Sequence, residues 1–145
     1  MNELTQNSEI QRIPPDGTAA TTWILAAGTS NVNSGEIDLM SSSSATLFVA
    51  VGVVTGAGIF SAQVQHSDTS GSGFTDIPGK VGAINGGSAD SGKMIVIDIA
   101  QPTKRFLRVA FTRGTANSVI DSVLAVKFRR SSPVAQGSTV ESAVI

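Results

Sequence analysis

Cysteine is absent from the chain, which has 145 residues. Disulfide bonds and thiolate metal sites are therefore excluded. The chain also has only one histidine, and one histidine without cysteine disfavours a zinc site, because zinc takes nitrogen and sulfur ligands in sets of three or four. The lack of disulfides favours assembly in a reducing cytosol, and we expect neither a metal nor another cofactor.

Charged side chains are also scarce, at 14% of the residues, where about 25% is usual. The net charge is −1, so no overall field would draw nucleic acid or an anionic membrane to the protein. Ser, Thr, Gly and Ala replace the charges, and such a weakly charged surface suggests a partner. The first fifteen residues lack the basic and apolar regions of a signal peptide. The longest apolar run, Leu47–Val54, is too short to cross a bilayer, so we expect no membrane association.

The positive charges that are present gather late in the chain. Seven bases and one acid, Asp121, lie between Lys104 and Arg130. The bases are Lys104, Arg105, Arg108, Arg113, Lys127, Arg129 and Arg130. They form either a solvated basic edge or a basic face that meets an acidic protein surface. Direct binding of nucleic acid is disfavoured, because the segment has no known binding motif and no aromatic residues interleaved with the bases.

The middle of the chain has the pattern of β-structure. Val, Ile, Phe and Thr alternate with polar residues, and clusters of Gly, Ser and Asn interrupt the alternation. The predicted strands are Thr21–Ala27, Gly35–Met40, Ala45–Val54, Ile59–His66, Phe74–Ile77, Lys80–Ile84, Lys93–Ala100, Arg105–Thr112 and Val119–Phe128. Eight or nine short strands with a turn about every ten residues predict an all-β fold, an antiparallel β-sandwich or barrel.

Two of these strands carry more detailed expectations. Ala45–Val54 is apolar at nearly every position, so it is expected in the centre of a sheet. The last two strands are expected to form a hairpin, with Arg113–Asn117 as its loop. In the last strand we expect Ile120, Leu124, Val126 and Phe128 to face the core together.

Polar segments flank the predicted sandwich and divide the chain into an N-terminal arm (1–19), the sandwich (20–130) and a C-terminal arm (131–145). The N-terminal arm ends with two prolines followed by Asp-Gly, which indicates an extended run and then a turn. Isolated apolar residues suit a segment that becomes ordered on a partner. The candidate contact residues in the arms are Leu4, Ile10, Ile13, Pro14, Pro15, Val140, Val144 and Ile145. The C-terminal arm adds a last strand either to its own sheet or to a neighbouring subunit.

One stretch, His66-Ser67-Asp68, contains the three residue types of a hydrolase triad. Adjacent residues on an extended chain point to opposite sides, so these three cannot form a proton relay among themselves. The sequence has no G-x-S-x-G motif that would supply another nucleophile. We therefore expect the end of a strand running into a Ser- and Gly-rich turn, and a protein that is not an enzyme.

Three other features invite a functional reading. Glu36 and Asp38 share one face of a predicted strand, and paired carboxylates can cleave glycosides or bind calcium, but a solvent-facing edge explains them as well. Asp68 and Asp76 flank the Ser/Gly loop and could hold a hard cation, although their spacing matches no EF-hand. Trp23 lies in the apolar run Trp-Ile-Leu-Ala-Ala, which favours a core position over a carbohydrate platform.

A family resemblance rests on four segments: Trp23–Gly28, Gly35–Leu39, Val64–Thr75 and Lys104–Val109. In this order they resemble the capsid cement, or decoration, proteins that tailed bacteriophages encode among their head genes, over residues 20–130. The resemblance implies a jelly-roll-like β-sandwich. The pattern of a strand, His-Ser-Asp, a Gly/Ser loop and Phe-Thr also occurs in phage tail and fibre modules.

The resemblance implies a binding role outside a phage head, bridging major capsid proteins to stabilise the shell, as a homo-oligomer (dimer or trimer). The location would be the virion surface, after assembly in the host cytoplasm. Besides the arm residues, the candidate contacts are Arg105, Arg108, Arg129 and Arg130. The alternative is a tail or fibre module that binds glycans of the host surface.

Overall fold

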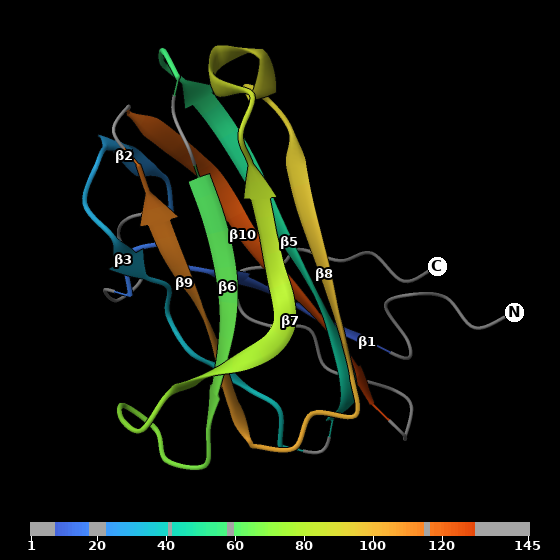
Figure 1. The fold of residues 1–145 in the computed structure, drawn as a ribbon. Helices are drawn as coiled ribbons and strands as arrows, with labels where there is room; N and C mark the ends of the chain where they lie inside the picture. The colour runs from blue at the N-terminus through green and yellow to red at the C-terminus, as the bar shows by residue number, and fades with distance from the viewer. Residues whose placement is uncertain (1–7, 18–22, 41, 58–59, 115–116, 130–145) are drawn as a thin grey trace, which may run out of the picture.

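The computed structural model describes residues 8–17, 23–40, 42–57, 60–114 and 117–129. They form two five-stranded sheets that pack face to face (Figure 1). In sheet A the strands run in the order β1 (Ser8–Ile13), β10 (Ser118–Arg129), β5 (Ser42–Val54) and β8 (Met94–Ala100), and β2 (Leu25–Gly28) pairs with the start of β10. In sheet B, β9 (Phe106–Arg113), β6 (Phe60–Ser67) and β7 (Thr75–Ile84) follow one another, while β3 (Val32–Asn33) and β4 (Ile37–Asp38) both pair with β9.

The prediction of an all-β antiparallel sandwich is confirmed, since every strand pair within the described residues is antiparallel. One 3₁₀ turn, η1 (Gly87–Asp90), precedes β8. No helix in the described part of the chain is long and apolar enough to cross a membrane.

The core lies between the sheets and follows the predicted alternation in most strands. Inward residues of β6 and β9 meet there, and the rings of Phe60 and Phe111 stack with centroids 5.7 Å apart. Ile95, Ile97 and Ile99 face inward from β8. At one point the sheets come so close that a Cβ on Gly82 would lie 2.1 Å from Ile95 Cγ2, so only glycine fits there.

Part of the predicted N-terminal arm belongs to the sandwich. Ser8–Ile13 forms β1 and pairs with β10 over its whole length, from Ser8 opposite Phe128 to Ile13 opposite Val123. Ile13 is fully buried in the core. Alternation in the sequence does not predict this strand, because Ile13 is the one large apolar residue of β1 that faces the core.

The expected hairpin of the last two strands is wrong. β9 lies in sheet B and β10 in sheet A, so the connection after Arg113 crosses from one sheet to the other. β10 instead fills the centre of sheet A between β1 and β5. A loop of hairpin length can join two sheets, because sandwich sheets lie only about 10 Å apart.

The strand predicted as two pieces, Phe74–Ile77 and Lys80–Ile84, is the single strand β7. Its register against β6 shifts between Gln63 and Gln65, and the extra residues include Pro78-Gly79. The Gln63 side-chain amide donates to the carbonyl oxygens of Ile77 and Lys80, at 3.0 and 3.2 Å. Proline is tolerated here because β7 is an edge strand.

Two bulges change which residues of β5 and β10 face the core. Ile120 pairs with Val51, and Ser122 pairs with Ala50, so Asp121 is an extra residue of β10. Beyond it Val123 and Ala125 point inward, whereas Leu124, Val126 and Phe128 occupy the opposite face of the strand. The expectation that Ile120 shares a face with Leu124, Val126 and Phe128 is therefore wrong, because one extra residue reverses the alternation.

Candidate functional site

The His66-Ser67-Asp68 stretch is confirmed as a strand end and a turn. Ser67 is buried, its Oγ donates to the carbonyl oxygen of Ser72 at 2.6 Å, and it accepts from the Thr69 amide at 3.0 Å. These two bonds close the loop that follows β6. The Ser67 hydroxyl is thus committed to holding the loop and is not directed at His66.

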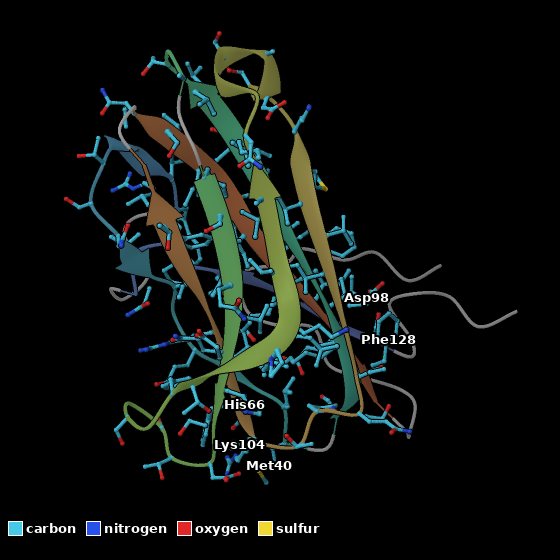
Figure 2. The ribbon with its side chains drawn as sticks, in the orientation of Figure 1. Met40, His66, Asp98, Lys104 and Phe128 are labelled. Atoms are coloured by element: carbon cyan, nitrogen blue, oxygen red, sulfur yellow. The ribbon has the colours of Figure 1, made fainter. Side chains whose placement is uncertain are left out.

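His66 lies at the same end of the sandwich (Figure 2). Its Nδ1 is 3.4 Å from Thr103 Oγ1. Burial lowers the pKa of His66 below its ordinary value, and the nearby charge of Lys104 lowers it further. No carboxylate within the described ranges is hydrogen-bonded to the His66 ring, which fits a structural position at the strand end.

Glu36 and Asp38, the paired carboxylates of the sequence, each bind a neighbouring segment. Glu36 accepts from the Gly71 amide at 2.6 Å and from Ser70 Oγ at 2.8 Å, which fixes the tip of the Ser/Gly loop. Asp38 accepts two hydrogen bonds from the Arg105 guanidinium, at 2.9 and 2.7 Å. These bonds are the largest cause that lowers the pKa of Asp38 below its ordinary value. Within the described residues no group of three or more His, Cys, Asp or Glu could hold a metal ion.

The seven bases between Lys104 and Arg130 do not form one basic face. Arg113 is buried and donates to the carbonyl oxygens of Ser30, Ala26 and Ser118, at 2.8, 2.8 and 3.3 Å. Lys127 is buried at the other end of the core, 2.8 Å from a carboxylate oxygen of Glu9. The reading of the whole segment as a surface for an acidic partner is therefore corrected.

The candidate contact residues are distributed as follows. Leu4, Arg130, Val140, Val144 and Ile145 lie outside the described residues. Ile13 and Pro15 are buried, and Pro14 is half-buried, so the first two are core residues and not contact residues. Arg105 and Arg108 lie on β9 or directly before it, on the sheet B side, and Arg129 ends β10. Ile10 is half-buried and pairs with Val126 on the outer side of sheet A.

Ile10 belongs to an apolar face that the alternation of residues in the sequence does not predict. We call the apolar residues on the outer side of sheet A the apolar face; they are Ile10, Phe48, Met94, Val96, Leu124, Val126 and Phe128, of which Val126 is only 8% exposed. Their registers place Leu124, Phe48 and Val96 in one row across β10, β5 and β8. Met94 and Val96 are 57% and 52% exposed. A solvated sheet would carry polar residues there, so this face is built to be covered.

Polar and charged residues border the apolar face, and Arg12 pairs with Leu124 at one end of its row. Thr46 Oγ1 donates to Asp98 Oδ1 at 2.6 Å, in the row next to Phe48. Figure 2 shows Asp98 and Phe128 on this side of the molecule. The Phe48 and Phe128 rings have no guanidinium stacked on them in the part of the chain that the structure describes.

Sheet B has a different outer side, the polar face, formed by Ser61, Gln63, Gln65, Asp76, Arg108 and Thr112. Its side chains bond one another: Arg108 Nε donates to Gln65 Oε1 at 2.7 Å, and Gln65 Nε2 donates to Asp76 Oδ1 at 2.8 Å. The Arg108 guanidinium also lies over the Phe74 ring, 4.3 Å from its centre. Beside Arg108 an open groove of about 530 Å³ runs between the Asp16-Gly17 turn and the segment 31–36.

Trp23 does not offer a free platform. It is half-buried just before β2. The Arg12 guanidinium stacks on its ring, 5.1 Å from the centre, and donates to its carbonyl oxygen at 3.3 Å. The expected core position is thus only partly correct, because a cation covers the ring where other apolar side chains were expected.

No family model matches the chain, and no curated protein matches it either. Several solved structures are similar in fold. One is chitosan-binding module 1 of a chitosanase/glucanase from Paenibacillus sp. IK-5, at 19% identity and a TM-score of 0.44 over 86% of this chain and 98% of that one. Another contains the CBM22-1 and GH10 modules of xylanase 10B from Clostridium thermocellum, at 13% identity and a TM-score of 0.49 over 91% of this chain and 30% of that one.

A third similar structure is Desmodium yellow mottle tymovirus, at 13% identity and a TM-score of 0.34 over 92% of this chain and 90% of that one. Identities this low carry no argument about a ligand or a partner, so the function has to be argued from the surfaces of this chain.

Proposed function

We propose that the chain is a structural virion protein, a cement or decoration protein that binds the outside of a tailed-phage head and bridges major capsid proteins. The observation that carries the proposal is the apolar face, a group of large apolar side chains on the outer side of sheet A, in which Met94 and Val96 are more than half exposed. Exposed apolar patches of this kind are typical of protein–protein contact. The sequence resemblance to cement proteins supplies the identity of the partner.

The four segments that carry this resemblance have structural roles in the sandwich. Val64–Thr75 forms the end of β6 and the loop that Ser67 and Glu36 hold in place. Lys104–Val109 leads into β9 and places Arg105 on Asp38. The resemblance thus covers strands and loops that hold the sandwich together. We propose neither an enzymatic activity nor a cofactor for this protein.

The size of the apolar face is informative. Neighbouring strands lie about 4.8 Å apart and successive outward residues about 7 Å apart, so the seven residues of the apolar face cover about 240 Å². A stable interface usually buries about 800 Å² per partner. The face alone is therefore too small for strong binding, and we propose that the arms 1–7 and 130–145, which begin beside Ser8 and Arg129, add contacts to the capsid. A homo-oligomer would multiply these weak contacts, and because they form only with the assembled shell, they stabilise that state by mass action.

The test is capsid binding by a pair of matched variants. Val96 on β8 and Val81 on β7 are both edge-strand valines, 52% and 51% exposed, on opposite sides of the sandwich. We expect Val96→Lys to weaken sedimentation with expanded phage capsids at least tenfold, because a lysine in a covered apolar face must be desolvated. Val81→Lys should bind as the unchanged protein does.

Both variants should keep the melting temperature of the unchanged protein, since both positions are exposed. Equal capsid binding by the two variants would overturn the assignment of the apolar face. Failure of the unchanged protein to bind capsids, or full heat resistance of particles that lack it, would overturn the cement function itself.

The alternative function, a glycan-binding tail or fibre module that uses Trp23, requires a sugar to displace the Arg12 guanidinium that stacks on the Trp23 ring. A glycan array probed with the Trp23→Ala variant decides this point. Loss of glycan binding with an unchanged melting temperature would favour the tail module.

A further inference from the structure

The groove on the polar face has walls that the backbone fixes. Gly35 N donates to the carbonyl oxygen of Pro14 at 2.8 Å, which ties the turn after β1 to the segment before β4. Gly17 has φ +71°, and a Cβ there would lie 2.9 Å from the Asn33 carbonyl oxygen. A side chain at position 17 would therefore be strained and would push the turn away. The two walls hold the groove open without a ligand.

Arg108 stands at the edge of this groove with its guanidinium already oriented. The Phe74 ring supports one face of it, and Gln65 receives its Nε proton. Gln65 is held in turn by Asp76. The two terminal nitrogens of Arg108 donate to no other group among the described residues, so a planar fork of donors is fixed in place and remains available.

The groove lining also contains hydrogen-bond acceptors, whereas the Arg108 guanidinium only donates. Asp16 contributes a carboxylate, and so does Glu36, whose two oxygens already accept from Ser70 and Gly71 and keep further lone pairs. Asn33 is an exposed amide that both donates and accepts. An anion would meet the two carboxylates, and a cation would meet Arg108. A sugar ring carries hydroxyl groups that donate and accept at once, so it can use the guanidinium and the carboxylates together.

Size and exposure separate a sugar from a zwitterion, which could also satisfy both charges. The groove of about 530 Å³ lies within the range of ligand sites, about 300–1,000 Å³, and is large for an amino acid. It is also open to solvent, where ion pairs are weak because water and salt screen them. Hydrogen bonds to vicinal hydroxyls are less sensitive to that screening.

We propose that the groove between the Asp16-Gly17 turn, the 31–36 segment and Arg108 binds a neutral glycan, with Arg108 as the residue that positions vicinal hydroxyls. This site is separate from the apolar face, because Arg108 and the 31–36 segment lie on the sheet B side and the apolar face lies on sheet A. A protein docked through sheet A would present the groove outward.

The experiment is a titration of the full-length protein, labelled with ¹⁵N, with glucose, galactose, mannose, maltotriose and cellotriose. N-acetylneuraminic acid and glycine betaine serve as anionic and zwitterionic probes. We expect at least one neutral sugar to shift the amide signals of Gly17, Asn33 and Gly35, with Met94 and Val96 unchanged. The Arg108→Lys variant keeps the charge but loses the fork, and it should bind that sugar at least tenfold more weakly.

Arg105→Lys is the matched control, since Arg105 is also an arginine beside β9 but pairs with Asp38 outside the groove lining. It should bind the sugar as the unchanged protein does. No shift with any neutral sugar, or stronger shifts with the anion or the zwitterion, would overturn the proposal. Capsid binding by Arg108→Lys should be normal, so failure here leaves the cement function standing.

Discussion

The outer sides of sheets A and B are made from neighbouring strands of one small sandwich, yet their chemistry is opposite. On sheet A, Phe48, Leu124 and Val96 form a continuous apolar row. On sheet B, Gln65, Arg108 and Asp76 form a hydrogen-bonded polar row. Both sheets contribute inner residues to one core, so the fold explains neither outer side. The difference indicates two surfaces with separate partners.

The aromatic residues show the same contrast. On the sheet B side the Arg105 guanidinium lies 4.8 Å from the centre of the Phe106 ring, and Arg108 covers Phe74. A stacked guanidinium gives an exposed ring a charged and hydrated cover. Phe48 and Phe128 on sheet A have no such cover among the described residues, which is expected where another protein surface will supply it.

The largest expected effect comes from deleting Asp121, the extra residue of the β10 bulge. Without it, Ile120 and the set Val123, Ala125 and Lys127 cannot all point inward. We expect a loss of about 5 kcal/mol or more, enough to unfold a domain of ordinary stability. Circular dichroism and thermal unfolding measure it.

Asp121→Ala is the control for this deletion, because it keeps the residue count and changes only an exposed side chain. It should unfold within about 0.5 kcal/mol of the unchanged protein. A deletion variant that melts normally would show that the apolar face does not depend on the bulge.

The second effect concerns the ion pair that lies beneath the apolar face. Lys127 Nζ is 2.8 Å from Glu9 and 3.2 Å from the Asp38 carbonyl oxygen, so it links β10 to β1 and to β4 in sheet B. Lys127→Met leaves the Glu9 carboxylate buried without its cation, and we expect a cost of about 3 kcal/mol. Urea unfolding of this variant measures the cost.

A double variant, Lys127→Met with Glu9→Gln, should recover more than half of that loss, because no charge then remains unpaired. A loss of less than about 1 kcal/mol in the free energy of unfolding for Lys127→Met would contradict this prediction. Water would then reach the Lys127–Glu9 pair, and the pair would not hold the inward orientation of Lys127 in β10.

The third effect compares two glutamines on one strand of sheet B. Gln63 donates to carbonyl groups in the β7 bulge, whereas Gln65 joins Arg108 to Asp76 at the surface. Gln63→Ala should cost about 1–2 kcal/mol, because its partners are held inside the bulge. Gln65→Ala should cost less than about 1 kcal/mol. Urea unfolding of both variants measures these losses in the free energy of unfolding. A larger loss for Gln65→Ala than for Gln63→Ala would show that the surface network is the main support of sheet B.

The smallest effect is a pH dependence confined to the sheet B side. The pKa of His66 is lowered in the folded protein, so the unfolded chain binds a proton more readily. Stability should therefore be complete above the unfolded pKa of about 6.5 and should decrease as pH falls below it. His66→Asn should remove the part of the decrease that occurs between about pH 7 and pH 5.

The measurement is the free energy of unfolding in urea across that pH range. Amide signals of Thr103 should move with pH, and those of Val96 should not. A His66→Asn variant with the same pH dependence as the unchanged protein would show that another group titrates there.

How far the sequence predicts the site differs from strand to strand. Alternation correctly places Phe60, Val64 and Val109 in the core, because β6 and β9 pair with each other without a register shift. It fails for Leu124, whose outward position depends on Asp121. It also fails for Arg113 and Lys127, because a sequence does not show which bases find carbonyl groups or a carboxylate inside the core.

The sequence by itself determined the all-β antiparallel class, the turn after His66 and the absence of disulfides, because these follow from local patterning and composition. Only the tertiary structure decided that Ser8–Ile13 is a strand, that β9 and β10 lie in different sheets, and that one outer side is apolar and the other polar. The physical reason is that a side chain's environment depends on register, and register is set between strands that lie far apart in the chain.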